Sequence, residues 1–197
     1  MPDWNKHYSI RDIDSHEISP VLELNRHLLP ATGKALDYAC GFAANARWLA
    51  SNGFTVTAWD ASEVAIEKLK KFSSENKLQL NAEVRDLENN PPTKSEFDII
   101  VVSFFLHRPT LRNLYAALKP GGLLLYQTFC GEQRNGRGPS NPEFRLKPGE
   151  LHEVYKDMQL LYYREDHQYG DTNVGMRDQV MLVAAKKTYE EQGHNRS

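Results

Sequence analysis

The stretch ALDYACGFAANARWLA, residues 35–50, joins a short apolar strand to a helix through a turn of small residues. We predict the strand over 34–38 and the helix over 44–52, and the small positions between them are Ala39, Gly41 and Ala43. In an open α/β sheet, ligands bind at the carboxyl ends of the strands. Small residues there allow close approach, and the following helix offers free backbone amides. The stretch therefore predicts a ligand site at the end of the first strand.

Strand and helix signals alternate on both sides of this stretch. We expect helices from Ser19-Pro20 with apolar positions Val21, Leu24 and Leu28, from Ser62, over 109–119 and over 149–156. Further strands are expected over 54–60, 78–85, 97–104, 123–129, 158–165 and 178–186, with a turn at KPGG (119–122). Apolar runs without alternation are typical of parallel strands covered on both faces. The pattern predicts a doubly wound α/β fold whose last two strands are antiparallel neighbours.

Three aspartates stand at the ends of three successive predicted strands, namely Asp37, Asp60 and Asp86. Asp37 would repel a pyrophosphate and attract a cation. A carboxylate at Asp60 could accept both hydroxyls of a ribose, and Asp86 with Leu87 could bind and pack on an adenine. Each aspartate alone is more often a helix cap or a turn residue. Together they suit S-adenosylmethionine, which carries an amine, a ribose and an adenine.

The motifs around these residues resemble those of class I S-adenosylmethionine-dependent methyltransferases, and more narrowly those of the small TehB-like, tellurite-resistance-related group. The resemblance rests on LDYACGFAANARWLASNGFTVTAWDAS, VRDLEN, FDIIVVSFFLHRP, LKPGGLLLYQTF and GPSNPEFRLKPGEL, and it covers roughly residues 4–187. It implies a Rossmann-like fold with a mostly parallel seven-stranded sheet and one antiparallel strand near the C-terminus. It also implies that S-adenosylmethionine is the cofactor and S-adenosylhomocysteine the product.

The same resemblance implies a set of cofactor-binding residues. The methionine end of the cofactor would be lined by residues 37–41, which include Asp37, Ala39, Cys40 and Gly41, and by Asn45 and Ser103. The ribose and the adenine would be held by Asp60, Ala61, Asp86 and Leu87. Tyr8 and Trp4 would fold over the cofactor as an N-terminal lid.

Two features depart from the family pattern. The usual Gly-x-Gly-x-Gly is Ala39-x-Gly41-x-Ala43 here, and we expect Ala39 to need only a negative φ, whereas Ala43 adds a methyl group beside the cofactor. The His-Arg pair near the C-terminus of tellurite enzymes has no clear match, and His167 is only nearby. The second departure argues against tellurite as the substrate.

The pair His107-Arg108 follows the predicted strand 97–104, where an acceptor would meet the methyl group. His107 could act as a general base and Arg108 could hold an anion. Alternatively, this segment closes the strand-to-helix turn, with His107 as a cap and Arg108 in a surface ion pair. We favour the structural role for His107. Both residues are therefore candidate catalytic residues with an open alternative.

Composition and charge exclude several classes of protein. The 197 residues carry 24 Lys plus Arg and 26 Asp plus Glu, a net charge of -2. This balance argues against a protein that coats nucleic acid or an anionic membrane. Two cysteines, Cys40 and Cys130, form no zinc motif, so we expect no metal, and they favour a reducing, cytoplasmic environment. No signal peptide or membrane span is expected.

A single domain is expected, divided into an N-terminal lid and helix (1–33), a cofactor core (34–128), a substrate lid (129–158), a strand pair (159–187) and a mobile tail (188–197). The arginine-rich loop within the lid suits an anionic substrate, although a solvated basic loop is an equal alternative. We expect methyl transfer to a small anionic or soft acceptor, such as a thiol or a chalcogen. The alternatives are an RNA or protein methyltransferase and a non-catalytic, cofactor-binding subunit. The sequence does not fix the oligomeric state.

Overall fold

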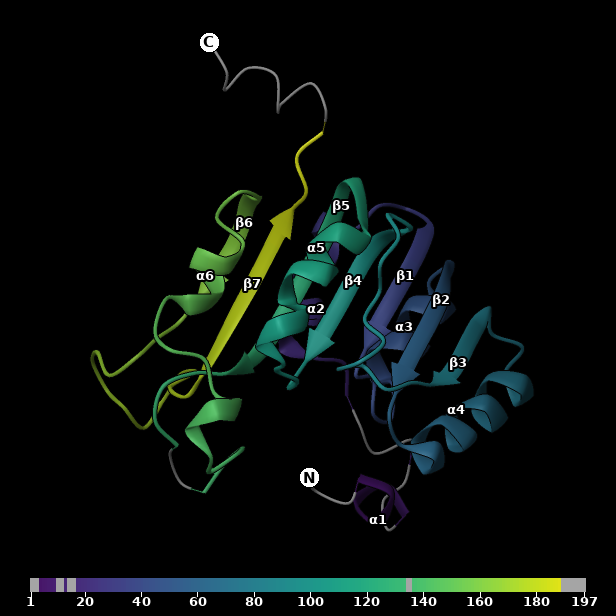
Figure 1. The fold of residues 1–197 in the computed structure, drawn as a ribbon, viewed down its shortest axis with the longest axis horizontal. Coiled ribbons are helices and arrows are strands. Elements are labelled where there is room, and N and C mark those ends of the chain that lie inside the picture. The colour runs from purple at the N-terminus through teal and green to yellow at the C-terminus, as the bar shows by residue number, and fades with distance from the viewer. Residues whose placement is uncertain (1–3, 10–12, 14–16, 134–135, 189–197) are drawn as a thin grey trace.

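The computed structural model describes residues 4–9, 13, 17–133 and 136–188 (Figure 1). Apart from residue 188, the expected mobile tail lies outside the described residues, as do the predicted lid residue Arg134 and parts of the N-terminal segment. Within the part that is described, no helix combines the length and apolar composition that crossing a bilayer requires.

Seven strands and a set of short helices alternate along the chain (Figure 1). The strands are β1 (Gly33–Tyr38), β2 (Phe54–Asp60), β3 (Leu80–Val84), β4 (Phe97–Ser103), β5 (Leu118–Phe129), β6 (Gln159–Arg164) and β7 (Gln179–Ala185). The α-helices are α1 (Trp4–Ser9), α2 (Pro20–Leu24), α3 (Ala44–Ser51), α4 (Glu63–Glu75), α5 (Leu111–Ala117) and α6 (Glu150–Val154). Single 3₁₀ turns are η2 (Arg26–Leu28), η3 (Arg108–Thr110) and η4 (Pro142–Phe144).

The strands form one sheet in the order β3-β2-β1-β4-β5-β7-β6. Strands β1 to β5 are mutually parallel, whereas β7 runs antiparallel to both β5 and β6. The predicted doubly wound fold with one antiparallel strand near the C-terminus is confirmed. In the parallel part, the carboxyl ends of β1, β2, β3, β4 and β5 meet along the lower edge of the sheet in Figure 1.

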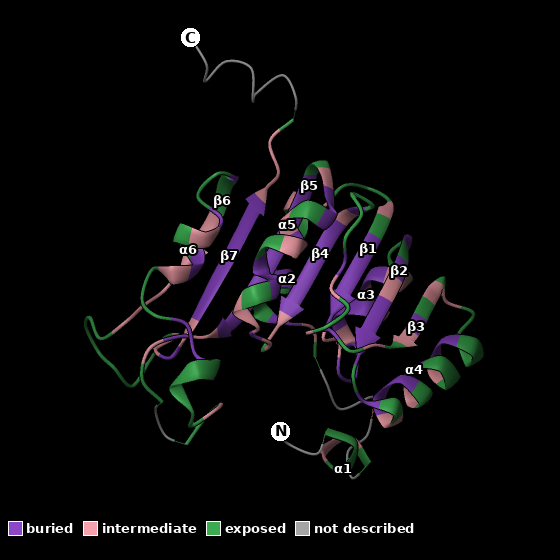
Figure 2. Ribbon diagram, viewed as in Figure 1, coloured by how far each residue is buried: buried purple, intermediate pink, exposed green. Residues whose placement is uncertain are grey.

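Helices cover both faces of the sheet, and each face has its own core. One core joins α5 and α6 to the sheet, and the other joins α2, α3 and α4. The central strands are consequently buried along most of their length, as the purple strands of Figure 2 show. In β4, for example, the side chains from Ile99 to Val102 are inaccessible to solvent. Burial on both faces explains why the strand sequences are continuous apolar runs.

Two local predictions were wrong. The expected turn KPGG lies inside β5, which pairs irregularly with β4 and continues the ladder through hydrogen bonds between Gly121, Gly122 and Lys186. The expected helix from Ser19 ends at Leu24, whose side chain is exposed, because Asn25 closes it through bonds to Val21 and Leu22. The Ser19 side chain makes no capping hydrogen bond there.

Candidate functional site

The expected site residues gather where the parallel strands end. Asp37 and Tyr38 close β1, Asp60 closes β2 and Ser103 closes β4. The short helix α1 lies below this edge of the sheet, and the segments that follow β5 and β6 lie below it at the left (Figure 1). Residues that are far apart in the sequence therefore meet along one edge, as the alternating pattern predicted.

Asp37 is a buried carboxylate. Its Oδ2 accepts a 2.9 Å hydrogen bond from the Ala46 amide in the first turn of α3. Burial raises the pKa of Asp37 to about 7, and the nearby charge of Asp60 adds to the increase, whereas hydrogen bonds from Ala46 and Asn45 oppose it. Such a group favours a cationic ligand, because a positive charge beside it restores the ionised form.

Asp60 ties the loop after β1 to the start of α4. Its Oδ2 accepts from the Gly41 amide at 2.8 Å, and its Oδ1 accepts from the Ser62 amide at 2.9 Å. Burial raises the pKa of Asp60. Each carboxylate oxygen has a second lone pair, so hydroxyl donors of a ribose can be accepted without breaking these two bonds.

The loop between β1 and α3 has a left-handed backbone at three alternate residues. The φ angles are +60° at Ala39, +52° at Gly41 and +54° at Ala43. The expectation that Ala39 needs only a negative φ was therefore wrong. Backbone hydrogen bonds from Cys40 to the Trp59 carbonyl and from Ala43 to the Cys40 carbonyl hold the loop in this shape. The loop thus keeps a glycine-type conformation at two alanines.

Ala39→Gly is expected to stabilise the protein by about 0.5–1 kcal/mol. Removing the strain of an alanine in the left-handed conformation stabilises the folded protein by about 1–2 kcal/mol. The greater conformational entropy of glycine in the unfolded chain offsets about 0.5–1 kcal/mol of this gain. The matched variant Ala43→Gly should gain less, because Ala43 is buried and its lost methyl costs about 0.8 kcal/mol. Urea unfolding of both variants measures the difference, and an Ala39→Gly protein less stable than the wild type would contradict it.

Asn45 connects the loop to two other segments. Its Nδ2 donates to Ser103 Oγ at 3.0 Å, and its Oδ1 accepts from the Ser19 amide at 2.8 Å. Cys40 lies between the two buried aspartates, and burial together with their negative charges raises the pKa of its thiol well above the usual range. Asn45 and Ser103 are therefore brought together as the resemblance implies, whereas Cys40 stays a neutral thiol.

Helix α1 places Tyr8 directly over the loop. A side chain at Gly41 would lie 2.6 Å from the Tyr8 hydroxyl, and the Tyr8 ring packs edge-on against Phe42 at 4.7 Å between centroids. Hydrogen bonds anchor the helix to α4: Lys68 Nζ donates to the Tyr8 carbonyl, and Ser62 Oγ and the Val64 amide donate to Asn5 Oδ1. The structure thus positions Tyr8 where an N-terminal lid was expected.

The expected adenine residues lie near the ends of β2 and β3, in different surroundings. The exposed Asp86 accepts hydrogen bonds from the Glu88 and Asn89 amides and from the Asn89 side chain. The bond from the Asn89 side chain is the main reason that the pKa of Asp86 is lowered. Leu87 is buried in the core, and its carbonyl accepts from the Tyr38 hydroxyl at 2.7 Å. Ala61 is exposed beside Asp60.

The two candidate catalytic residues have structural partners. His107 Nδ1 lies 3.3 Å from Thr110 Oγ1, and its Nε2 lies 4.0 Å from Glu88. Arg108 donates to both carboxylate oxygens of Glu150, at 2.6 and 3.0 Å, and also to the carbonyls of Glu143 and Arg145. Of the two interpretations left open for Arg108, the structure shows the ion pair.

Arg145 belongs to the arginine-rich loop for which anion binding and a solvated surface role were left open, and it fills neither role. Its side chain is 2% exposed and lies 3.7 Å from the Asp178 carboxylate. Its guanidinium donates to six backbone carbonyls, those of Cys130, Gly131, Glu132, Arg137, Pro139 and Asp178. The residue therefore holds the lid segment in place. Arg137 remains exposed.

A cavity of about 990 Å³ opens beside the end of β5. One wall is the lid segment, with Cys130, Gly131, Pro142 and Lys147 among its lining residues, and the other wall comprises Glu165, His167, Arg177 and Gln179. The residues of this second wall were not predicted from the sequence. They could have been found from the loop between the last two strands, because an antiparallel pair returns that loop to the edge of the sheet where β5 ends.

The residues at the ends of β1 and β2 fit an adenosyl sulfonium compound. Two buried carboxylates provide negative potential, and the missing side chain at Gly41 leaves the space that the Tyr8 hydroxyl occupies. Among the described residues, no group of three or more His, Cys, Asp or Glu side chains is arranged to hold a metal ion.

The family model of "Tellurite resistance protein TehB" matches residues 4–177. The chain belongs to the TehB family. Among curated relatives, a probable S-adenosyl-L-methionine-dependent methyltransferase TehB of Haemophilus influenzae is 29% identical over 68% of this chain and 48% of its own. A ubiquinone biosynthesis O-methyltransferase of Coxiella burnetii is 32% identical over 64% of this chain and 56% of its own. The chain thus spans about half the length of these relatives.

Solved structures of TehB proteins share the fold. The crystal structure of TehB from Haemophilus influenzae has a TM-score of 0.72 at 23% identity, covering 93% of this chain and 67% of that one. A TehB-like methyltransferase structure from Corynebacterium glutamicum has a TM-score of 0.64 at 21% identity, with 94% and 97% covered. The predicted family and the Rossmann-like methyltransferase fold are therefore confirmed.

Proposed function

We propose that this TehB-family chain transfers a methyl group from S-adenosylmethionine to a small acceptor by direct in-line displacement. The family match and the buried acidic pair at the ends of β1 and β2 support the cofactor. The relatives named as methyltransferases support the reaction. The acceptor class is supported by the cavity beside β5.

Three groups of residues would hold the cofactor. Asp37 and the loop around Gly41 would face its cationic methionine end, with Asn45 and Ser103 beside them. Asp60 would accept the ribose hydroxyls, and Tyr8 would cover the loop from α1. Asp86 and Ala61 would lie near the adenine. Leu87 would support this region from the core, because its side chain is buried.

The bound cofactor supplies an electrophilic methyl group on a positively charged sulfur. Because that charge disappears during transfer, the protein has little new charge to stabilise, and alignment of the acceptor dominates. Alignment can contribute up to about 7–11 kcal/mol in ideal intramolecular cases. The rigid edge of the sheet and the bond between Asn45 and Ser103 serve this alignment.

The size of the cavity and its fixed lid wall carry the proposal of a small acceptor. Its volume of about 990 Å³ lies at the upper end of the range for small-molecule sites. The lid segment that walls it is fixed by Arg145 at five of its own carbonyls, and the same side chain binds the Asp178 carbonyl. A fixed wall favours a compact molecule over a macromolecular surface, and the near-neutral charge of the chain agrees with that.

A labelled-methyl assay tests this function. Cell extract is separated into small-molecule, RNA and protein fractions, and each is incubated with the protein and methyl-labelled S-adenosylmethionine. We expect label in the small-molecule fraction only, and none with the Asp37→Asn variant. Label in RNA or protein would contradict the proposed acceptor class. Cofactor binding with no labelled product in any fraction would instead support a non-catalytic, cofactor-binding subunit.

A further inference from the structure

The carboxylate of Glu165 lies directly after β6 and is enclosed by hydrogen-bond donors. Its side chain is 4% exposed. Its oxygens accept from the Tyr163 hydroxyl, from Cys130 Sγ at 3.1 Å and from the Gly149 amide at 3.2 and 3.3 Å. The Nε2 atom of His167 lies 3.2 Å from Glu165 Oε1. Three segments of the chain thus fix one buried carboxylate against one histidine.

Cys130 and Tyr163 are fixed donors in this cluster. Burial is the main cause that raises the pKa of each, and the contact with Glu165 raises both further. Both side chains therefore keep their protons at neutral pH and hold the carboxylate in place. His167 is the member of the cluster whose second ring nitrogen has no part in the contact with Glu165.

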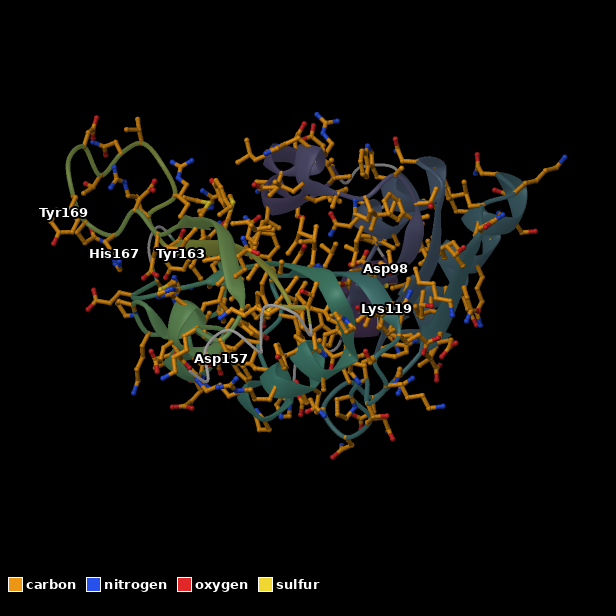
Figure 3. All side chains as sticks on the ribbon, turned by 90° about the horizontal axis from the view of Figure 1, so that it is seen from above. Asp98, Lys119, Asp157, Tyr163, His167 and Tyr169 are labelled. Carbon is orange, nitrogen blue, oxygen red and sulfur yellow. The ribbon has the colours of Figure 1, made fainter. Side chains whose placement is uncertain are left out.

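His167 stands on the wall of the cavity. It lies with Tyr163 at one end of the molecule (Figure 3), its φ is +50°, and its side chain is 38% exposed. The contact with Glu165 favours the tautomer that carries hydrogen on Nε2, which leaves Nδ1 as a free acceptor. A strained, half-exposed histidine held by a buried carboxylate is the usual arrangement of a histidine that accepts protons.

The cavity also lies close to the methyl-transfer position. Its lining includes Cys130 after β5 and Gln179 at the start of β7. Strand β5 neighbours β4, which ends at Ser103, and β7 is the next strand. Ser103 pairs with Gln127, three residues before Cys130. At about 4.8 Å between strands and about 3.3 Å per residue, the cavity wall begins about 11 Å from Ser103. An acceptor that contacts His167 must bridge this distance to reach the end of β4.

The arginines of the cavity wall are engaged by the protein itself. Arg108 is paired with Glu150, and Arg145 lies beside Asp178. Arg177 donates to backbone carbonyls of the loop after β6, including the carbonyl of His167 at 3.4 Å. The cavity also carries Lys147, Glu132 and Glu143. The loop composition suggested a positive charge that could bind an anion. That charge is largely offset by the acidic residues and backbone carbonyls that already contact these side chains.

We propose that His167 is the general base of the reaction and that the acceptor is a neutral compound with a hydroxyl or thiol group. This rests on the proposed methyltransferase function. The acceptor oxygen or sulfur bonds to the methyl carbon, the carbon–sulfonium bond breaks and its electron pair stays on sulfur. The acceptor proton passes to His167 Nδ1 and then to water. Glu165 is a positioning residue that orients the imidazole.

Two acceptor probes separate this role from a structural one. Catechol keeps its proton at neutral pH and needs a base, whereas 4-nitrothiophenol is already a thiolate and needs none. We expect His167→Gln to slow catechol methylation about 10²–10⁴-fold, the usual contribution of a general base. Methylation of 4-nitrothiophenol should stay within threefold, and calorimetric binding of S-adenosylhomocysteine should not change. His27→Gln, which alters an exposed histidine of η2, is the matched control.

The positioning role of Glu165 has a readout that does not need turnover. Glu165→Gln removes the carboxylate that contacts His167 Nε2, so the ring should no longer be held in one tautomer and its nitrogen NMR signals should move. Catechol methylation should slow, whereas methylation of 4-nitrothiophenol should stay within threefold. Unchanged ring signals would contradict the contact between the two residues.

The outcomes of these experiments distinguish the two proposals. Normal catechol turnover in His167→Gln would overturn the base while leaving the methyltransferase function intact. A wild-type protein that methylates small molecules only at nitrogen, at carbon or on an oxyanion would overturn the hydroxyl or thiol class. A wild-type protein that binds S-adenosylhomocysteine but labels nothing would overturn the proposed function, and the base with it.

Discussion

The Asp37→Asn variant is expected to lose about 10- to 150-fold in affinity for S-adenosylmethionine while the ligand-free protein becomes more stable at neutral pH. The carboxylate is buried at the end of β1, and burial raises its pKa to about 7. A cationic ligand gains from the ionised form, and hydrogen bonds to charged groups contribute about 1.5–3 kcal/mol. Asparagine still accepts the Ala46 amide but provides no charge.

The pH dependence of stability follows from the direction of this shift. An acid with a raised folded-state pKa ionises first in the unfolded chain. Stability is therefore unaffected below the unfolded value of 3.8, falls as pH rises to about 7 and is constant above. The penalty above pH 7 is about 4 kcal/mol as an upper bound, at 1.36 kcal/mol per pKa unit. Asp37→Asn should recover about 2–4 kcal/mol of it.

Calorimetry and thermal unfolding measure both effects. Binding of S-adenosylmethionine to the wild type should tighten about fivefold from pH 6 to pH 7 and release protons, since the ligand favours ionised Asp37, whose pKa is about 7. The proton release appears as a difference between buffers of unlike ionisation enthalpy. In Asp37→Asn the affinity for S-adenosylmethionine should no longer depend on pH between 6 and 7. An Asp37→Asn protein with wild-type affinity would show that this carboxylate does not face the cofactor.

Arg145→Met is expected to cost about 3–5 kcal/mol of stability, the usual result of removing one partner from a buried ion pair. The guanidinium lies against Asp178 and satisfies six backbone carbonyls of the lid and of the segment before β7. Methionine fills a similar volume but leaves those groups without a donor. The lid segment should then detach, and the wall of the cavity with it.

Urea unfolding together with limited proteolysis within residues 136–148 checks this expectation. The exposed Arg137→Met is the matched control and should change stability by less than about 0.5 kcal/mol. The double variant Arg145→Met with Asp178→Asn should recover part of the loss, because it removes the unpaired charge. If Arg145→Met were as stable as Arg137→Met, the arginine would not be the anchor of the lid.

Local sequence signals predicted most elements of the sheet. Strand β2 was predicted with its observed bounds, because an apolar, aromatic and β-branched run stands between Gly53 and Ala61. The turn expected at KPGG failed because that segment pairs with Lys186, more than sixty residues later. The exposure of Leu24 likewise depends on where α2 ends. The helix ends there because Asn25 caps it through hydrogen bonds to the preceding turn.

The site was predictable where chemistry coincides with a strand end, as at Asp37 and Asp60. Arg145 could not be placed, because an arginine in a polar loop looks solvated until the segment that encloses it is known. The left-handed φ of Ala39 could not be predicted either, since alanine disfavours it and only hydrogen bonds from neighbouring segments impose it. Glu165 and His167 were missed because two of the donors that hold Glu165, Cys130 and Gly149, come from distant segments.

The left-handed alanines of the loop after β1 bear on how such sites diverge in evolution. The ligand requires a backbone path, and here that path is maintained by Asp60 and by amides of neighbouring segments. Glycine at these positions lowers the strain but is not what defines the shape. Related proteins can therefore carry alanine in place of glycine and still present the same backbone amides. A motif defined by residue types would miss such proteins, whereas a motif defined by backbone dihedral angles would find them.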